Sequence, residues 1–277
     1  MHPFRFCIAV TLLFAWAVVA SAAITDFGTW TLVQDPAHPG FTASATSTTA
    51  TLSAGNLAIP AGTDIGYQSV NGSTPGSSSN GFYFSPLSDF SLAIDYAWSF
   101  SAGPTGFLGL GFGIGEDADG MNSAGVAMVT SDGSPFLTFA GAARINDVNQ
   151  SPLPLGNPIF NPSTLSGTLF VQYQAASGDV TIGAATSQGA GAPTVMDKFV
   201  GIGNQWSGDK LMTSFFIRSD ESTPGTTWSG GNADAVFSNF RVLNGSAVAI
   251  PEPSTAITSC LVLCLFLTRR TRHPSRG

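Results

Sequence analysis

Cysteine and histidine are scarce in this chain, and their positions exclude several kinds of chemistry. The three cysteines, Cys7, Cys260 and Cys264, all lie close to the ends of the sequence. Residues 23–250 therefore fold without disulfides, whatever the redox state of their compartment. The same segment holds one histidine, His38. A zinc site needs more histidine or cysteine ligands than this, and no G-x-S-x-G turn accompanies His38 to indicate a nucleophilic serine.

Basic side chains are also few between the two ends. Residues 23–250 carry 16 acidic and 5 basic side chains, which gives a net charge near −11. Phosphate contacts need a basic surface, so this balance argues against nucleic acid as a partner. An acidic polymer is also an unfavourable partner unless a cation bridges it, and calcium is the obvious cation for that role.

A helical period of 3.6 residues is missing from the same segment, whereas a period of two is clear. At residues 90–100, large apolar side chains alternate with small or polar ones, which predicts a strand with one buried face. Ten or more strands separated by turn residues predict an all-β antiparallel β-sandwich. The other expected strands are residues 27–34, 41–53, 107–115, 126–130, 136–140, 167–175, 180–184, 199–203, 211–218 and 235–243.

The order of these strands resembles a concanavalin-A-like or laminin-G-like jelly roll. The resemblance rests on residues 90–100, on the expected hairpin at 167–184 and on the closing strand at 234–242. It implies a two-layer fold of the kind that hosts glycosidase activity. An immunoglobulin-like sandwich is the main alternative.

The N-terminus has the pattern of a secretory signal peptide. Arg5 precedes an apolar run at residues 7–20, and Ala20 and Ala22 supply small residues at the −3 and −1 positions of a cleavage site before Ala23. Residues 1–22 are therefore expected to be removed after the secretion translocon exports the chain. The alternative is an uncleaved anchor helix.

The C-terminus combines a turn, an apolar run and a basic tail. Pro251, Glu252 and Pro253 stop any helix, and a new helix is expected at residues 255–268. It would be about 21 Å long at ~1.5 Å per residue, which is short for a bilayer core of about 30 Å. The alternative is a buried core helix, although such a helix does not require the basic residues that follow. These are Arg269, Arg270, Arg272 and Arg276.

This tail resembles the PEP-CTERM sorting signal of exported bacterial proteins. The matching features are Pro251-Glu252-Pro253, the apolar run and the arginine cluster. The resemblance implies recognition by an exosortase, a membrane enzyme thought to cleave near the motif, in bacteria that make exopolysaccharide and biofilm. We therefore expect a sandwich domain at residues 23–244, a linker at 245–249 and a sorting signal at 250–277. The protein would be anchored in the membrane transiently, and then reside at the cell surface or outside the cell.

Two features between residues 107 and 122 are candidates for binding. Glycines alternate with apolar residues at 107–115, which predicts a strand with a flat face; either a neighbouring backbone or a flat ligand can approach such a face. An acidic turn follows directly. Its oxygen-bearing side chains suit Ca²⁺, although their spacing is not that of an EF-hand, and a solvated acidic turn is the alternative. The candidate ligands are Glu116, Asp117, Asp119 and Asn122.

Trp206 and Trp228 lie in polar, glycine-containing segments. An exposed aromatic face in such a loop suits stacking against a sugar ring, whereas a buried one caps the core. A non-catalytic structural or glycan-binding protein is the first functional hypothesis. A secreted carbohydrate-active enzyme is the second, but only Glu116 and Glu221 are available as glutamates and no E-x-D-x-x-E motif is present. An adhesin for protein partners is the third.

Overall fold

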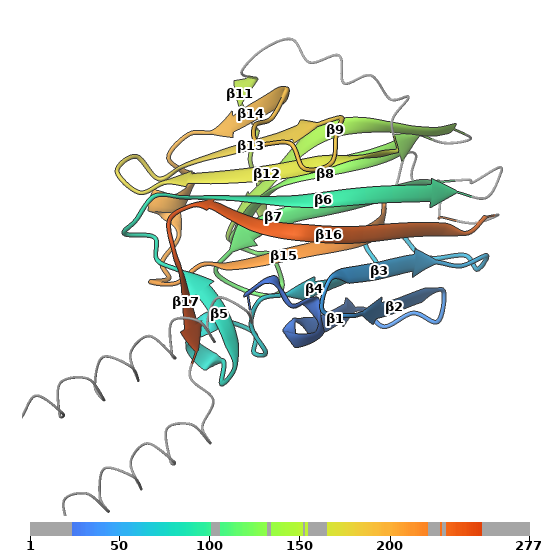
Figure 1. Cartoon of the computed structure of the whole chain (residues 1–277), viewed down its shortest axis with the longest axis horizontal. Helices are drawn as coiled ribbons and strands as arrows, with labels where there is room; N and C mark the ends of the chain where they lie inside the picture. The colour runs from blue at the N-terminus through green and yellow to red at the C-terminus, as the bar shows by residue number, and fades with distance from the viewer. Residues whose placement is uncertain are drawn as a thin grey trace, which may run out of the picture.

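The computed structural model describes residues 24–100, 106–131, 134–151, 153–154, 165–220, 228 and 231–250. The described strands form two large sheets and a small two-stranded one, and their pairings are antiparallel. The two large sheets stack face to face, with the eight-stranded sheet in front in Figure 1. The fold is therefore an all-β antiparallel sandwich, as the alternating sequence predicts.

Neighbouring strands in each large sheet often come from distant parts of the chain. In spatial order, the seven-stranded sheet contains β1 (Thr31–Asp35), β4 (Asp64–Gln68), β15 (Met212–Asp220), β7 (Phe107–Gly115), β8 (Ser123–Ser131), β9 (Ser134–Ile145) and β10 (Val148–Asn149). The eight-stranded sheet contains β11 (Leu153–Pro154), β14 (Val195–Phe199), β13 (Asp179–Ala185), β12 (Ser166–Gln174), β6 (Phe90–Phe100), β16 (Ala233–Asn244), β3 (Thr49–Ala54) and β2 (Phe41–Ala45).

Smaller elements close the ends of the sandwich. β5 (Gly81–Phe84) pairs with β17 (Ala247–Ile250) in the two-stranded sheet, which lies at one end of the molecule in Figure 1. Three short 3₁₀ helices complete the described elements: η1 (Phe27–Thr29), η2 (Pro75–Ser77) and η3 (Ile202–Gln205).

The core fills the space between the two large sheets. Phe215 of β15 and Phe237 of β16 meet there with ring centroids 4.6 Å apart. Each strand contributes every second residue, so the period of two in the sequence becomes one buried face. From the two central strands, the fully buried inward side chains are Leu92, Ile94, Tyr96, Leu108, Leu110 and Phe112.

The two most regular strands of the sequence are confirmed with the predicted bounds, β6 and β7. The single strand expected at residues 41–53 is wrong. Thr46 Oγ1 accepts hydrogen bonds from the backbone N–H groups of Thr48 and Thr49, and this turn separates β2 from β3. The strand expected at residues 199–203 is also wrong, because the chain leaves β14 at Phe199 and turns through Gly201, at φ +64°, into η3.

The linker expected at residues 245–249 is wrong in its second half. Gly245, at φ +83°, turns the chain out of β16, and β17 then pairs with β5 in register from Ala247 opposite Phe84 to Ile250 opposite Gly81. Backbone hydrogen bonds therefore hold the chain up to the residue before Pro251.

The targeting predictions fall on residues that the structure does not describe. These are the signal peptide at 1–22 with Ala20 and Ala22, the Pro251-Glu252-Pro253 motif, the apolar run at 255–268 and the arginine tail. Among the described residues, no helix combines the length and apolar character that crossing a membrane requires.

Candidate functional site

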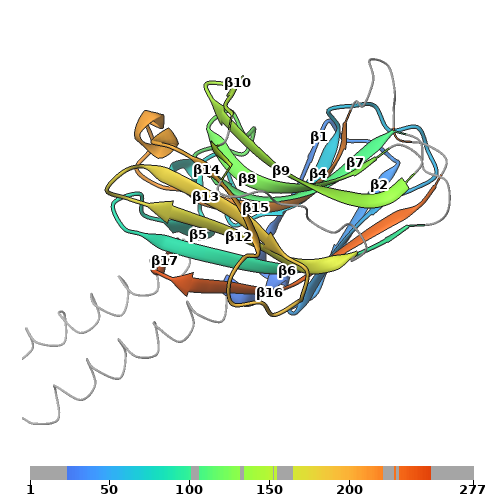
Figure 2. The same cartoon turned by 90° about the horizontal axis from the view of Figure 1, so that it is seen from above.

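A groove of about 680 Å³ lies on the outer face of the seven-stranded sheet. Figure 2 shows this sheet curving away from the eight-stranded sheet toward both of its edges, so that the backbone of the sheet is concave on its outer side. Five neighbouring strands, β4, β15, β7, β8 and β9, contribute outward-facing residues to the groove. Its volume is in the range that accommodates small ligands, about 300–1,000 Å³.

Glycine is required in the floor of the groove because β7 and β8 approach closely there. Gly113 and Gly125 stand opposite each other in the ladder. A Cβ atom on Gly113 would lie 2.8 Å from the Ala124 carbonyl oxygen, and one on Gly125 would lie 2.7 Å from that of Phe112. The backbone itself is therefore the floor, with Ala127 and Ala142 continuing it toward β9. Crowding explains these glycines, and it leaves a flat surface that a ligand can reach.

One aromatic ring, that of Phe216, lies in the groove. Phe216 faces outward on β15, between Gly66 of β4 and Gly111 of β7. A Cβ atom on Gly111 would lie 2.4 Å from Cζ of this ring, so the ring occupies the place of the missing side chain. Phe216 is half-buried and lines the groove, which gives a sugar ring an apolar face to contact.

Sequence reasoning missed Phe216 as a site residue. The signal in the sequence was the alternation of side chains along a strand. In the strand predicted at 211–218, Phe215 and Ile217 point to the core, so Phe216 must point to the outer face. An aromatic residue on the outward face, beside polar Ser214 and Arg218, was the feature to single out.

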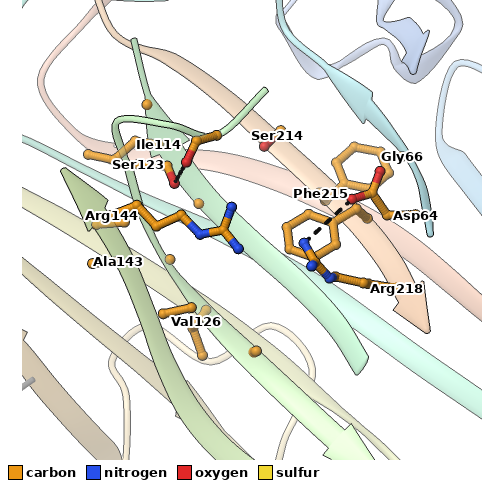
Figure 3. Close-up of a pocket in the computed structure, with 18 of the residues that line it drawn as sticks. Asp64, Gly66, Ile114, Ser123, Val126, Ala143, Arg144, Ser214, Phe215 and Arg218 are labelled. Carbon is orange, nitrogen blue, oxygen red and sulfur yellow. Dashed lines mark hydrogen bonds and ion pairs between the residues drawn. The ribbon is translucent and has the colours of Figure 1, made fainter. Parts of the chain in front are cut away.

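Two arginines flank the floor. Arg144 extends from β9 and Arg218 from β15, and Figure 3 shows them reaching toward one another across the groove. Arg218 Nη1 lies 3.8 Å from Asp64 Oδ2. Arg144 Nη1 donates to Asp147 Oδ1 at 3.0 Å, and its Nε donates to Asn149 Oδ1 at 3.2 Å. Both side chains are about one-third exposed, 31% and 32%, and remain accessible from the groove.

The predicted calcium ligands lie on one turn at an end of the groove, but their oxygens face different partners. Glu116 is buried and accepts a hydrogen bond from the backbone N–H of Gly208. Asp117 Oδ1 accepts from the N–H of Met121 at 2.9 Å. Asn122 Oδ1 accepts from the N–H of Asn146 at 2.9 Å. These contacts fix the turn itself, so the donor set does not fit a calcium cage.

Two further observations describe the environment of the turn. Burial raises the pKa of Glu116 and of Asp117, each with a smaller contribution from the next carboxylate along the turn, Asp117 and Asp119 respectively. In the part of the chain that the structure describes, no three His, Cys, Asp or Glu side chains are grouped to hold a metal ion. The calcium site stays a prediction, and what the structure describes at this turn is a set of hydrogen bonds within the protein.

Both tryptophans predicted as exposed sugar contacts are buried, so that prediction is wrong. Trp206 is 8% exposed, and its Nε1 donates to the Arg144 carbonyl at 3.4 Å. Trp228 is fully buried, and its backbone carbonyl accepts from the N–H of Ile59 at 2.9 Å. The alternative, that these residues cap the core, is the one that the structure supports. Neither tryptophan is among the residues that line the groove.

The two glutamates named as candidate catalytic residues do not form a described pair. Glu116 is turned toward Gly208, and Glu221 lies outside the described residues. The groove contains Asp64, but this carboxylate is the ion-pair partner of Arg218.

Comparisons with known proteins give fold likeness alone. No protein-family model and no curated protein matches the chain. Among solved structures, it is similar to the CBM2 module of the evolved Dit of Lactobacillus casei BL23 phage J-1, at 12% identity and TM-score 0.41, over 80% of this chain and 95% of that one. It is also similar to lectin I of Ulex europaeus, at 11% identity and TM-score 0.39, over 76% of this chain and 98% of that one. The Lotus tetragonolobus seed lectin is similar at 8% identity and TM-score 0.39, over 81% of this chain and 98% of that one. These likenesses are too remote to carry an argument about ligands.

Proposed function

We propose that this chain is an exported, non-catalytic β-sandwich protein that binds polysaccharide in the groove of its seven-stranded sheet. The observation that carries the proposal is the groove itself: a floor of backbone and alanine beside the ring of Phe216, with hydrogen-bonding side chains at its sides. Sugar rings have apolar faces and hydroxyl edges, and this combination suits both.

The position of the groove supports an extended ligand. It runs over five strands and is open along the outer face of the sheet, rather than enclosed within a loop. A chain of sugar rings can lie along such a surface with several units in contact at once.

A matched pair of tryptophan substitutions tests the proposal. Ala127→Trp places an indole on the groove floor, and Gln172→Trp places one at an exposed position on β12 in the eight-stranded sheet. On a glycan array, we expect the unmodified chain to bind at least one class of polysaccharide. Ala127→Trp should weaken that binding by more than about tenfold, a loss of about 1.4 kcal/mol, while Gln172→Trp should leave it unchanged. Equal binding by both variants would contradict the groove as the binding site.

Export and sorting form the second half of the proposal. The pattern of residues 1–22 and 250–277 supports secretion through the translocon and processing by an exosortase-type enzyme at the membrane. The cell surface or the extracellular matrix is then the place where the groove meets its ligand.

Processing makes a prediction for the mass of the mature protein. β17 pairs with β5 as far as Ile250, and the Pro251-Glu252-Pro253 motif follows directly in the sequence. Cell fractionation with intact-mass spectrometry should therefore find a surface or extracellular form that begins at Ala23 and ends close to Pro251. A form that retains residues 255–277 in the medium would contradict cleavage of the tail.

A further inference from the structure

Two of the five basic residues in segment 23–250 lie on the groove, in a segment that is otherwise strongly acidic. They are Arg144 and Arg218, and they come from opposite sides of the floor (Figure 3). A neutral sugar chain needs hydrogen-bond donors and acceptors but no cation. Three aspartates, Asp64, Asp117 and Asp119, also line the groove, so the positive charge is local to the two guanidinium groups. Their presence there requires an explanation beyond binding sugar in general.

The ion pair of Arg218 with Asp64 does not satisfy all the hydrogen-bond donors of its guanidinium group. The 3.8 Å separation from Asp64 is long for a hydrogen bond. Its Nε is buried and has no hydrogen-bond partner among the described residues. A buried donor without a partner costs free energy, but this atom is covered by protein, so a ligand in the groove would meet the exposed part of the side chain.

Arg144 is held in place by hydrogen bonds that involve only two of its three guanidinium nitrogens. Its bonds to Asn149 and Asp147 use Nε and Nη1, and these two partners belong to the β9–β10 hairpin. They fix the direction of the side chain toward the groove (Figure 3). Nη2 remains for a ligand, and an anchored arginine loses little side-chain entropy when one binds.

The space between the two arginines is lined by small residues, among them Gly113, Gly125 and Ala127. A ring can lie there with a substituent within reach of either guanidinium. The planar fork of arginine matches the two oxygens of a carboxylate, and it also binds sulfate oxygens. Asp117 and Asp119 line the end of the groove, so an anionic group is favoured between the arginines rather than toward that turn.

From these contacts we propose that the groove selects an anionic polysaccharide, with Arg144 and Arg218 binding the acidic groups of its sugar rings. This inference rests on the proposed function and specifies its ligand class. The negative charge of the body repels such a polymer at long range, so binding depends on these two local contacts. At physiological salt that repulsion is screened beyond about 8 Å, whereas contacts within the groove are screened much less.

Binding of the full chain to four immobilised polymers tests the inference. The polymers are polygalacturonate, its methyl ester, dextran sulfate and neutral dextran. We expect binding to an anionic polymer, with Arg144→Gln and Arg218→Gln each weakening it by about tenfold, as for the loss of one charge-assisted hydrogen bond. Lys210→Gln removes a charge that lies over the ring of Tyr83, away from the groove, and is the matched control without effect.

The polymers separate the possible results. Binding to polygalacturonate but not to its methyl ester assigns the contact to carboxylates, and binding to dextran sulfate alone assigns it to sulfate esters. Both support the proposal. Binding to the neutral polymers as tightly as to the charged ones, unchanged in both arginine variants but lost in Ala127→Trp, would overturn the anionic preference and leave the groove function standing. Absence of binding on this panel and across the glycan array would contradict the proposed function itself.

Discussion

Trp228→Ala is expected to destabilise the fold by about 3–5 kcal/mol, the usual cost of deleting a fully buried tryptophan side chain. Trp228 has no exposed surface and contacts Phe100, with ring centroids 6.3 Å apart. The substitution leaves a cavity between the sheets, and the lost packing is not recovered by solvent. Urea denaturation should show a lower midpoint with little change in slope.

Trp228→Phe is the control for this prediction. It keeps most of the buried ring and removes the indole N–H, which has no hydrogen-bond partner among the described residues. We therefore expect a much smaller loss than for alanine. If Trp228→Ala instead kept full stability and lost polysaccharide binding, Trp228 would be a sugar contact and its burial would be wrong.

Asp95→Ala is expected to cost about 3 kcal/mol, because it removes the buried carboxylate that pairs with half-buried Arg241 and leaves several hydrogen-bond donors without their acceptor. Asp95 is 5% exposed and lies on the outer face of β6. Its carboxylate accepts hydrogen bonds from Thr168 Oγ1 at 2.6 Å, Asn239 Nδ2 at 2.8 Å and Gly189 N at 2.9 Å, and Arg241 lies at 3.2 Å. The network holds the connection between β13 and β14 against the eight-stranded sheet. Asp147→Ala, in an exposed pair, should hardly change stability.

The pH dependence of this difference is a second check. Burial alone would raise the pKa of Asp95, but its four donors together hold it below the ordinary value. A carboxylate with a lowered pKa in the folded state stabilises the protein above its unfolded pKa, near 3.9, and loses that contribution as the pH falls through the folded value. The difference in melting temperature between the unmodified chain and Asp95→Ala should therefore shrink from pH 7 toward pH 3. A constant difference would mean that the charge of Asp95 does not contribute.

The parts of the fold that were predicted correctly are those with a strict local pattern in the sequence. Residues 90–100 and 107–115 alternate without interruption, and one periodic face is enough to define a strand and its buried side. The turn at Thr46 and the strand β17 were missed because their signals are weak in the sequence. The first depends on one side chain bonding to its own turn, and the second on pairing with β5, more than 160 positions earlier.

The groove was not predicted because it depends on the register between strands that are distant in the sequence. A single sequence does not reveal that register. Gly111 and Phe216 are side by side only because β7 pairs with β15 in one register. For the acidic turn, the sequence showed which oxygen-bearing side chains were present but not the direction in which each one points. The tryptophans have polar neighbours along the chain, whereas their burial comes from packing against residues far away in the sequence, such as Phe100 for Trp228.

The most direct test of the account is to map the bound polysaccharide onto the glycines of the protein. In the full chain labelled with ¹⁵N-glycine, the groove glycines and those of the eight-stranded sheet give separate NMR signals. On titration with an oligosaccharide of the polymer that binds, the account predicts shifts at Gly109, Gly113, Gly115 and Gly125, with Gly167 of β12 and Gly183 of β13 unchanged. Shifts confined to the second group would place the ligand on the opposite side of the sandwich and contradict the account.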